Sequence, residues 1–167
     1  RGTFSDVSNM PELAQILLKD ENHLEVQADI LDWQSINIQR LKLNSKAYDL
    51  EVNGQMGLSK GLLDFNWQGK GPEVSTLAPA LHKELQGKSI THQGSIKGHF
   101  SDFRAETRLK IEDFSAPAFA LKPTQFLSAL SLQYRPELLQ GQGQLAFQSD
   151  TAKLEISAEL LKQAEVL

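Results

Sequence analysis

The sequence contains one string that matches a catalytic motif. Gly57-Leu58-Ser59-Lys60-Gly61 has the G-x-S-x-G spacing in which a serine acts as a nucleophile. That chemistry needs a sharp turn from a strand into a helix, and an acid and a histidine that the fold brings close to the serine. Here the next residues alternate as a strand does, with Leu63, Phe65 and Trp67 on one side. Ser59 is therefore predicted to lie in a hairpin turn, and we expect no catalytic residues and no enzymatic activity.

Metal and cofactor chemistry is not indicated either. The four histidines show no metal-ligand spacing with one another or with nearby carboxylates, and the chain has no cysteine. Among them, His92 is predicted to point inward as a hydrogen-bonded histidine. Gly69-Lys70-Gly71 leads into Pro72 and lacks the rest of a phosphate loop or a dinucleotide fingerprint. We expect neither a metal ion nor a cofactor.

Charge and composition exclude further classes of protein. The 17 basic residues are interleaved with 21 acidic ones for a net charge of -4, which argues against a nucleic-acid surface. No apolar run approaches the roughly 20 residues of a membrane-spanning helix. The chain begins with Arg1 and shows no signal-peptide pattern. We therefore expect a segment of a larger protein.

Most of the chain alternates between apolar and polar residues, which indicates strands with one face in water. The stretch from Phe103 to Glu112 is typical, because a charged residue occupies nearly every second position. The same pattern predicts about nine strands with short connections, as antiparallel sheets prefer. A phase slip of one residue between Ile38 and Leu41 predicts a bulge.

Two segments have helical spacing instead and precede sets of strands. They cover residues 5–20 and 75–85, and the start of the first is similar in sequence to residues 73–81. Gly69-Lys70-Gly71-Pro72 is the strongest break in the first half of the chain. We predict two repeats of a helix followed by a meander, 1–70 and 71–167, packed as one continuous sheet.

The apolar face of such a sheet must be covered. It can pack against a second sheet, close on itself, or curve around something outside the chain. Apolar strand faces normally form an ordinary core, and the alternation alone does not distinguish a core from an open face. Two short helices are too small to cover nine strands.

Several stretches resemble the repeating unit of the TamB and AsmA-like proteins of the bacterial envelope. They are Val74 to Leu81, the pair Gln86-Gly87, Gly94 to Gly98 and Phe103 to Leu109, and Leu138 to Leu145 is similar to the strand openings of these repeats. The resemblance covers most of the chain from Asp6 to Phe147. It implies a mainly β fold, with a long curved antiparallel sheet, a U-shaped, taco-like groove and one or two short helices.

The resemblance also implies a function and a location. Such proteins are anchored in the inner membrane of Gram-negative bacteria, extend through the periplasm and resemble bridge-like lipid-transfer proteins. Their apolar groove conducts phospholipid between the inner and outer membranes or shelters strands of outer-membrane proteins. The expected partners are phospholipid acyl chains, outer-membrane β-barrel assembly proteins and flanking segments of the same full-length chain. An alternative is a chaperone-like scaffold that assists outer-membrane protein assembly by β-strand augmentation.

A lipid groove would be lined by the apolar side chains of the strands. Each methylene of an acyl chain that leaves water contributes about 0.8 kcal/mol without any directional contact, so no polar constellation is needed. The predicted groove lining is Leu50, Val52, Met56, Leu58, Phe65, Trp67, Ile96, Phe100, Phe103, Leu109, Ile111, Leu132, Leu145, Phe147, Leu154 and Ile156. The alternative for each of these residues is an ordinary core position.

Overall fold

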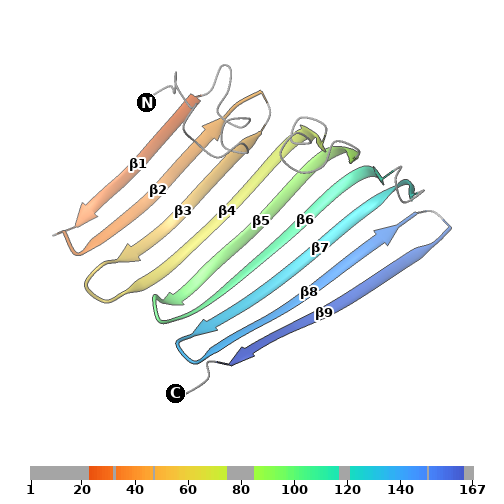
Figure 1. The fold of residues 1–167 in the computed structure, drawn as a ribbon. Coiled ribbons are helices and arrows are strands. Elements are labelled where there is room, and N and C mark those ends of the chain that lie inside the picture. The colour runs from red at the N-terminus through yellow and green to blue at the C-terminus, as the bar shows by residue number, and fades with distance from the viewer. Residues whose placement is uncertain are drawn as a thin grey trace, which may run out of the picture.

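The described part of the chain is a sheet of nine strands in sequence order. The computed structural model describes residues 23–31, 33–46, 48–74, 85–116, 121–149 and 151–163. The strands are β1 (His23–Leu31), β2 (Ser35–Asn44), β3 (Asp49–Gly57), β4 (Leu62–Glu73), β5 (Gln86–His99), β6 (Asp102–Ala116), β7 (Leu121–Arg135), β8 (Leu138–Gln148) and β9 (Lys153–Gln163) (Figure 1).

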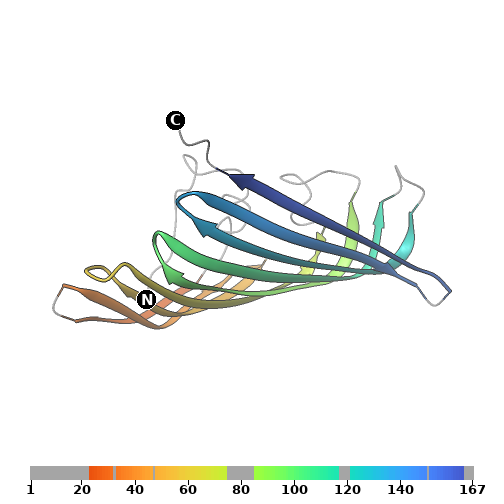
Figure 2. The ribbon, with the colours of Figure 1, turned by 90° about the horizontal axis from the view of Figure 1, so that it is seen from below.

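Each strand pairs antiparallel with its neighbours in the sequence, so the sheet is one continuous meander. The edge strands β1 and β9 do not pair with each other, and the sheet is therefore open. Figure 2 shows that it is strongly twisted and curved. The prediction of a mainly β, long curved antiparallel sheet is confirmed.

The predicted helices lie outside the described residues, apart from Leu85, which directly precedes β5. The helix-plus-meander repeat therefore stays a prediction. Its proposed boundary between residues 70 and 71 falls within β4.

The predicted break at Gly69 to Pro72 is wrong, because these residues belong to β4. The ladder between β4 and β5 continues through Gly71, paired with Ile90, to Glu73. The ladder between β3 and β4 has already ended, since its last pair joins Asp49 and Lys70. The end of β4 thus has one partner strand, and a proline is tolerated where a strand lies at an edge.

Bulges bend the sheet at two places. In β2, the register shifts between Ile38 and Leu41 against β3, which confirms the predicted phase slip. In β5 and β6, shifts occur around Ser89 and Asp113, whose φ angles are 49° and 51°. Lys88 and Asp113 form an ion pair of 3.3 Å across this bend. Figure 2 shows the start of β5, the end of β6 and the start of β7 turned out of the plane of the sheet.

The bent strand ends enclose the core of the described region. Tyr48, Val74, Ile90, Ile111, Phe114 and Ala116 form one buried cluster, and Leu50, Leu85, Leu109, Phe126 and Phe147 pack against it. The rings of the three phenylalanines lie 5.1–6.1 Å apart, which is the range of favourable aromatic contacts. The core therefore lies at one end of the strands.

Candidate functional site

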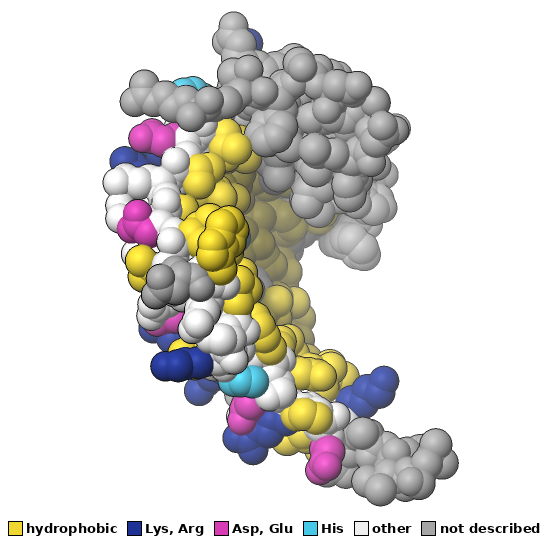
Figure 3. All heavy atoms as spheres, turned by 90° about the vertical axis from the view of Figure 1, so that its left-hand side faces the viewer, with side chains coloured by type: hydrophobic (Ala, Val, Ile, Leu, Met, Phe, Trp, Pro, Cys, Tyr) yellow, Lys and Arg dark blue, Asp and Glu magenta, His cyan; other side chains and the backbone are white. Residues whose placement is uncertain are grey.

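The register of the strands gathers the predicted lining residues on one face of the sheet. Cross-strand partners share a face, so Leu50 leads through Gly69, His92, Leu109 and Ser128 to Leu145 and Ile156. We call this side the apolar face. It also carries Val52, Met56, Phe65, Trp67, Ile96, Phe103, Ile111, Leu132, Phe147 and Leu154. Figure 3 shows hydrophobic side chains along the hollow side of the curve and charged ones on the outside.

Two of the predicted lining residues do not lie on this face. Leu58 and Phe100 belong to the turns after β3 and β5, and both are exposed. The apolar–polar alternation continues past Gly57 and His99, where the strands end, and this continuation placed them wrongly on the sheet.

Exposure of the apolar face changes along the strands. In the packed cluster Ile111 is only 7% exposed, whereas Leu130 and Leu160, farther along the strands, are 50% and 54% exposed. Trp67, Phe65, Ile96, Phe103 and Leu132 are half-buried, because side chains within the sheet cover one another. The apolar face is therefore closed at the core and open over the rest of its described length.

Glycines on the apolar face let large rings lie across the neighbouring strand. The indole of Trp67 lies over Gly94, and a Cβ at Gly94 would overlap it and the carbonyl oxygen of Glu106. Phe65 lies over Gly54 in the same way. Sequence analysis missed this arrangement, although the signal was present, since both glycines fall on the apolar positions of their strands. The rings thus occupy the space that the missing side chains of Gly54 and Gly94 leave open.

A polar pair marks the boundary between the packed and the open part. The hydroxyl of Tyr48 lies 2.6 Å from Nδ1 of His92, above Gly69. Burial raises the pKa of Tyr48 to about 12. Burial also lowers the pKa of His92, although hydrogen bonds with the backbone oppose this effect. The phenol therefore stays protonated and can donate to a neutral imidazole. His92 points inward, as predicted.

The opposite face is polar and carries exposed ion pairs. Lys97 and Asp64 are 3.7 Å apart across β5 and β4, and Arg40 and Glu51 are 3.0 Å apart across β2 and β3. Such pairs contribute little to stability and mainly keep the face hydrated. A shallow furrow of about 990 Å³ crosses this face and is lined by charges of both signs, with Lys70, Arg108 and Lys110 lying between Asp49 on β3 and Glu155 on β9. Lys70 is paired with Asp49 and Lys110 with Glu112, which offsets part of the positive charge in the furrow.

In the part of the chain that the structure describes, no side-chain arrangement indicates catalysis or metal binding. Ser59 lies in the hairpin turn between β3 and β4, as predicted. Among the described residues, no three His, Asp or Glu side chains converge to hold a metal ion. The residues that the structure describes also include no helix that is long and apolar enough to span a membrane. Comparisons with protein-family models, curated proteins and solved structures found no match.

Proposed function

We propose that this chain is a periplasmic segment of a bridge-like lipid-transport protein and binds phospholipid acyl chains along its apolar face. The observation that carries the proposal is the open face itself. A row of large apolar side chains runs from β1 to β9, and side chains such as Leu130, Leu154 and Leu160 keep half or more of their surface exposed. Soluble proteins rarely expose a continuous apolar patch of this extent unless a partner covers it.

Acyl chains match the shape and chemistry of this face. Neighbouring strands lie about 4.8 Å apart, so nine strands give an apolar surface about 40 Å long. Because acyl chains require apolar contact and no hydrogen bonds, a face lined mainly by apolar side chains suits them. The hollow curvature seen in Figure 3 increases the contact with a chain that lies in it.

The resemblance to TamB and AsmA-like repeats supplies the setting of the proposal. In that setting the chain belongs to a protein anchored in the inner membrane, and flanking segments of the same protein extend the groove toward the outer membrane. The chain has no enzymatic role in this proposal, and its contribution is a passive apolar surface.

Lipid that copurifies with the protein gives the first test. Protein from a Gram-negative host is examined by native mass spectrometry, and a photoreactive residue is placed at Phe103, at Met56 or, as a control, at Lys110 on the polar face. We expect bound phospholipid and crosslinks to lipid from positions 103 and 56. Equal crosslinking from position 110 would contradict the proposal.

A second candidate function rests on the edge strand β9. This strand has 11 residues without a proline, and no register shift interrupts its ladder with β8. Ile156, Leu160 and Leu161 are exposed on it. Edges of this kind accept an added strand, as a scaffold for outer-membrane protein assembly would require. If this candidate is right, a client peptide protects the outward amides of β9 from hydrogen exchange without displacing lipid.

A further inference from the structure

One end of the sheet carries large exposed apolar residues on its hairpin tips. The turns after β1, β3 and β5 lie at this end and contain Trp33, Leu58 and Phe100 (Figure 1). Trp33 is 84% exposed, and the other two are 46% and 45% exposed. None of these three side chains contributes to the packed cluster. Their apolar surface needs another explanation.

Backbone hydrogen bonds join the three tips into one line. The amide of Leu58 donates to the carbonyl of Gln34, which is next to Trp33, with a distance of 2.6 Å. The amide of Phe100 donates to the carbonyl of Gly61, in the turn after β3, with a distance of 2.8 Å. The apolar tips are thus held in place relative to one another before any partner binds.

At this end of the sheet, the face that is polar elsewhere also carries apolar residues. Leu31 and Leu62 lie on the otherwise polar face next to the tips, and both are at least half exposed. Ile30, Met56 and Phe103 lie on the apolar face beside them. At this end of the sheet, exposed apolar side chains therefore lie on both faces, with Ser35 and His99 in the same row as Leu31 and Leu62. Apolar groups on both faces suit insertion into the interface of a membrane.

The backbone conformation of Trp33 disfavours a tryptophan at this position, which indicates that its side chain has a role of its own. Its φ angle is 55°, in the left-handed region that bulky residues rarely adopt and that asparagine or glycine adopts readily. Neither the turn nor the interior of the fold therefore requires a tryptophan here. Strained residues of this kind are often retained at binding surfaces.

We propose that the rim formed by Trp33, Leu58, Phe100, Leu31 and Leu62 inserts into the interfacial region of a phospholipid bilayer. Tryptophan prefers this region, and Lys60, in the turn of Leu58, adds a positive charge that lipid phosphate groups attract. Three tips in a line suit a fluid surface, which needs no complementary pocket. The inference goes beyond the proposed acyl-chain binding, because it names the surface through which the molecule meets a membrane.

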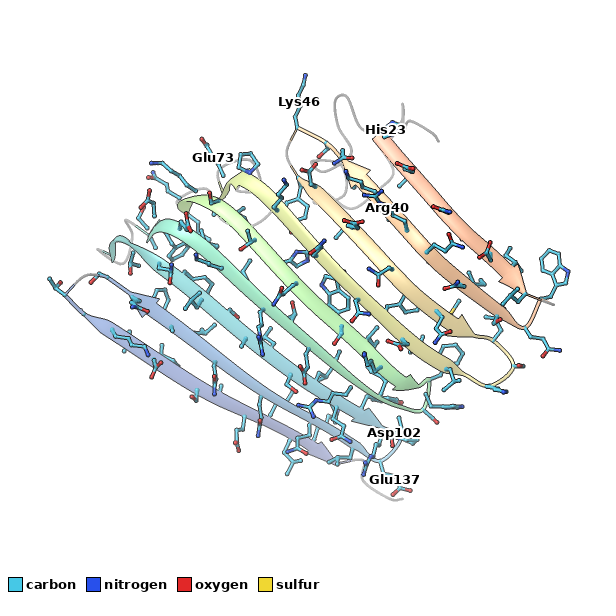
Figure 4. All side chains as sticks on the ribbon, turned by 180° about the vertical axis from the view of Figure 1, so that it is seen from behind. His23, Arg40, Lys46, Glu73, Asp102 and Glu137 are labelled. Carbon is cyan, nitrogen blue, oxygen red and sulfur yellow. The ribbon has the colours of Figure 1, made fainter. Side chains whose placement is uncertain are left out.

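The hairpin after β7 provides an internal control. It lies at the same end, but its tip consists of Pro136 and Glu137, and the nearby Asp102 and Arg135 form an ion pair of 3.2 Å. Figure 4 shows Asp102 and Glu137 together at this corner, away from His23 and Lys46 at the other end. We expect the rim of β1 to β5 to enter the membrane and this corner to stay in water.

Vesicle binding tests the proposal directly. The chain with Trp67→Phe keeps Trp33 as its only tryptophan. With vesicles of phosphatidylethanolamine and phosphatidylglycerol, we expect the emission of Trp33 to shift to the blue and brominated lipid to quench it. Trp33→Asn, Leu58→Ser and Phe100→Ser, made in the wild-type chain, should each weaken binding in a flotation assay by about tenfold. Glu137→Gln and Ser59→Ala should leave it unchanged.

Unfolding cannot explain a loss of binding in the Trp33→Asn variant. Asparagine fits the left-handed turn, so this variant should be at least as stable as the wild type in urea. Three results would each overturn the proposal. They are absence of vesicle binding by the wild-type chain, binding by the three variants as strong as that of the wild type, and a photocrosslink from position 33 to a protein in place of lipid. If the protein copurifies with lipid but does not bind vesicles, the proposal that the rim inserts into a membrane would be wrong. The proposal that the apolar face binds acyl chains would not be affected.

Discussion

At the scale of single residues, the apolar face depends on positions that lack a side chain. Trp67 can lie flat only because Gly94, on the neighbouring strand, has no Cβ, and Gly141 on β8 gives a matched contrast. A Cβ at Gly141 would find its nearest neighbours, Leu132 and Leu160, at an ordinary 3.6 Å. The two glycines therefore lie on one face with different freedom to accept a methyl group.

We predict that Gly94→Ala lowers the free energy of unfolding by about 2 to 3 kcal/mol, because the indole of Trp67 and the β6 backbone must move. Gly141→Ala should change it by less than about 1 kcal/mol, and can raise it by restricting the unfolded chain. Urea denaturation followed by circular dichroism measures both. Equal losses in the two variants would show that Trp67 does not need the space above Gly94.

At this scale, the sequence predicts which face of the sheet a residue lies on better than it predicts which residues of neighbouring strands it contacts. Alternation places Val52, Phe65 and Ile96 on one side because successive strand residues point to opposite faces. It does not show that Trp67 meets Gly94, since that contact depends on the register of two strands. It also fails at Leu58 and Phe100, where the pattern continues after the ladder has ended.

At the scale of elements, the bulge in β2 is an insertion that the sheet tolerates. Gln39 is the extra residue, because Arg40 pairs with Gln27 and Ile38 pairs with Ala28. Its exposed side-chain amide, through Nε2, donates a hydrogen bond to Oδ2 of Asp29 at 2.6 Å. Removing it would give β2 an uninterrupted alternation with its partners.

Deletion of Gln39 should therefore cost less than about 1 kcal/mol, since it removes an exposed side chain and reduces local twist. Deletion of Gln93, in the regular centre of β5, should cost about 4 kcal/mol or more, because a slip of one residue moves apolar side chains to the polar face. Urea denaturation of the two deletion variants tests this contrast. A Gln93 deletion as mild as that of Gln39 would contradict the observed register.

The ends of strands are harder to predict from the sequence than their central parts, because they depend on where the neighbouring strands end. Glycine and proline at positions 69–72 suggest a break, yet β4 continues through them. The outcome depends on the neighbours, since β3 has ended and β5 still pairs there. Local composition contains no information about where a partner strand stops.

At the scale of the whole molecule, one face is a core at one end and a surface at the other. The sequence predicts the apolar face but not this division, because Ile111 and Ile156 occupy equivalent positions in their alternating strands. Only the bent ends of β5 to β7 distinguish them. Ile111 lies inside the packed cluster, whereas Ile156 on β9 is 46% exposed.

The same substitution at these two positions measures how far the face is open. Ile111→Ala should lower the free energy of unfolding by about 3 kcal/mol, since it leaves a cavity among Val74, Ile90 and Phe114. Ile156→Ala should cost less than about 1 kcal/mol in lipid-free protein, because water already reaches its side chain. Urea denaturation of delipidated protein gives both values. If Ile156→Ala were as costly as Ile111→Ala, something other than solvent would cover β9, and the open face on which acyl-chain binding depends would not exist in solution.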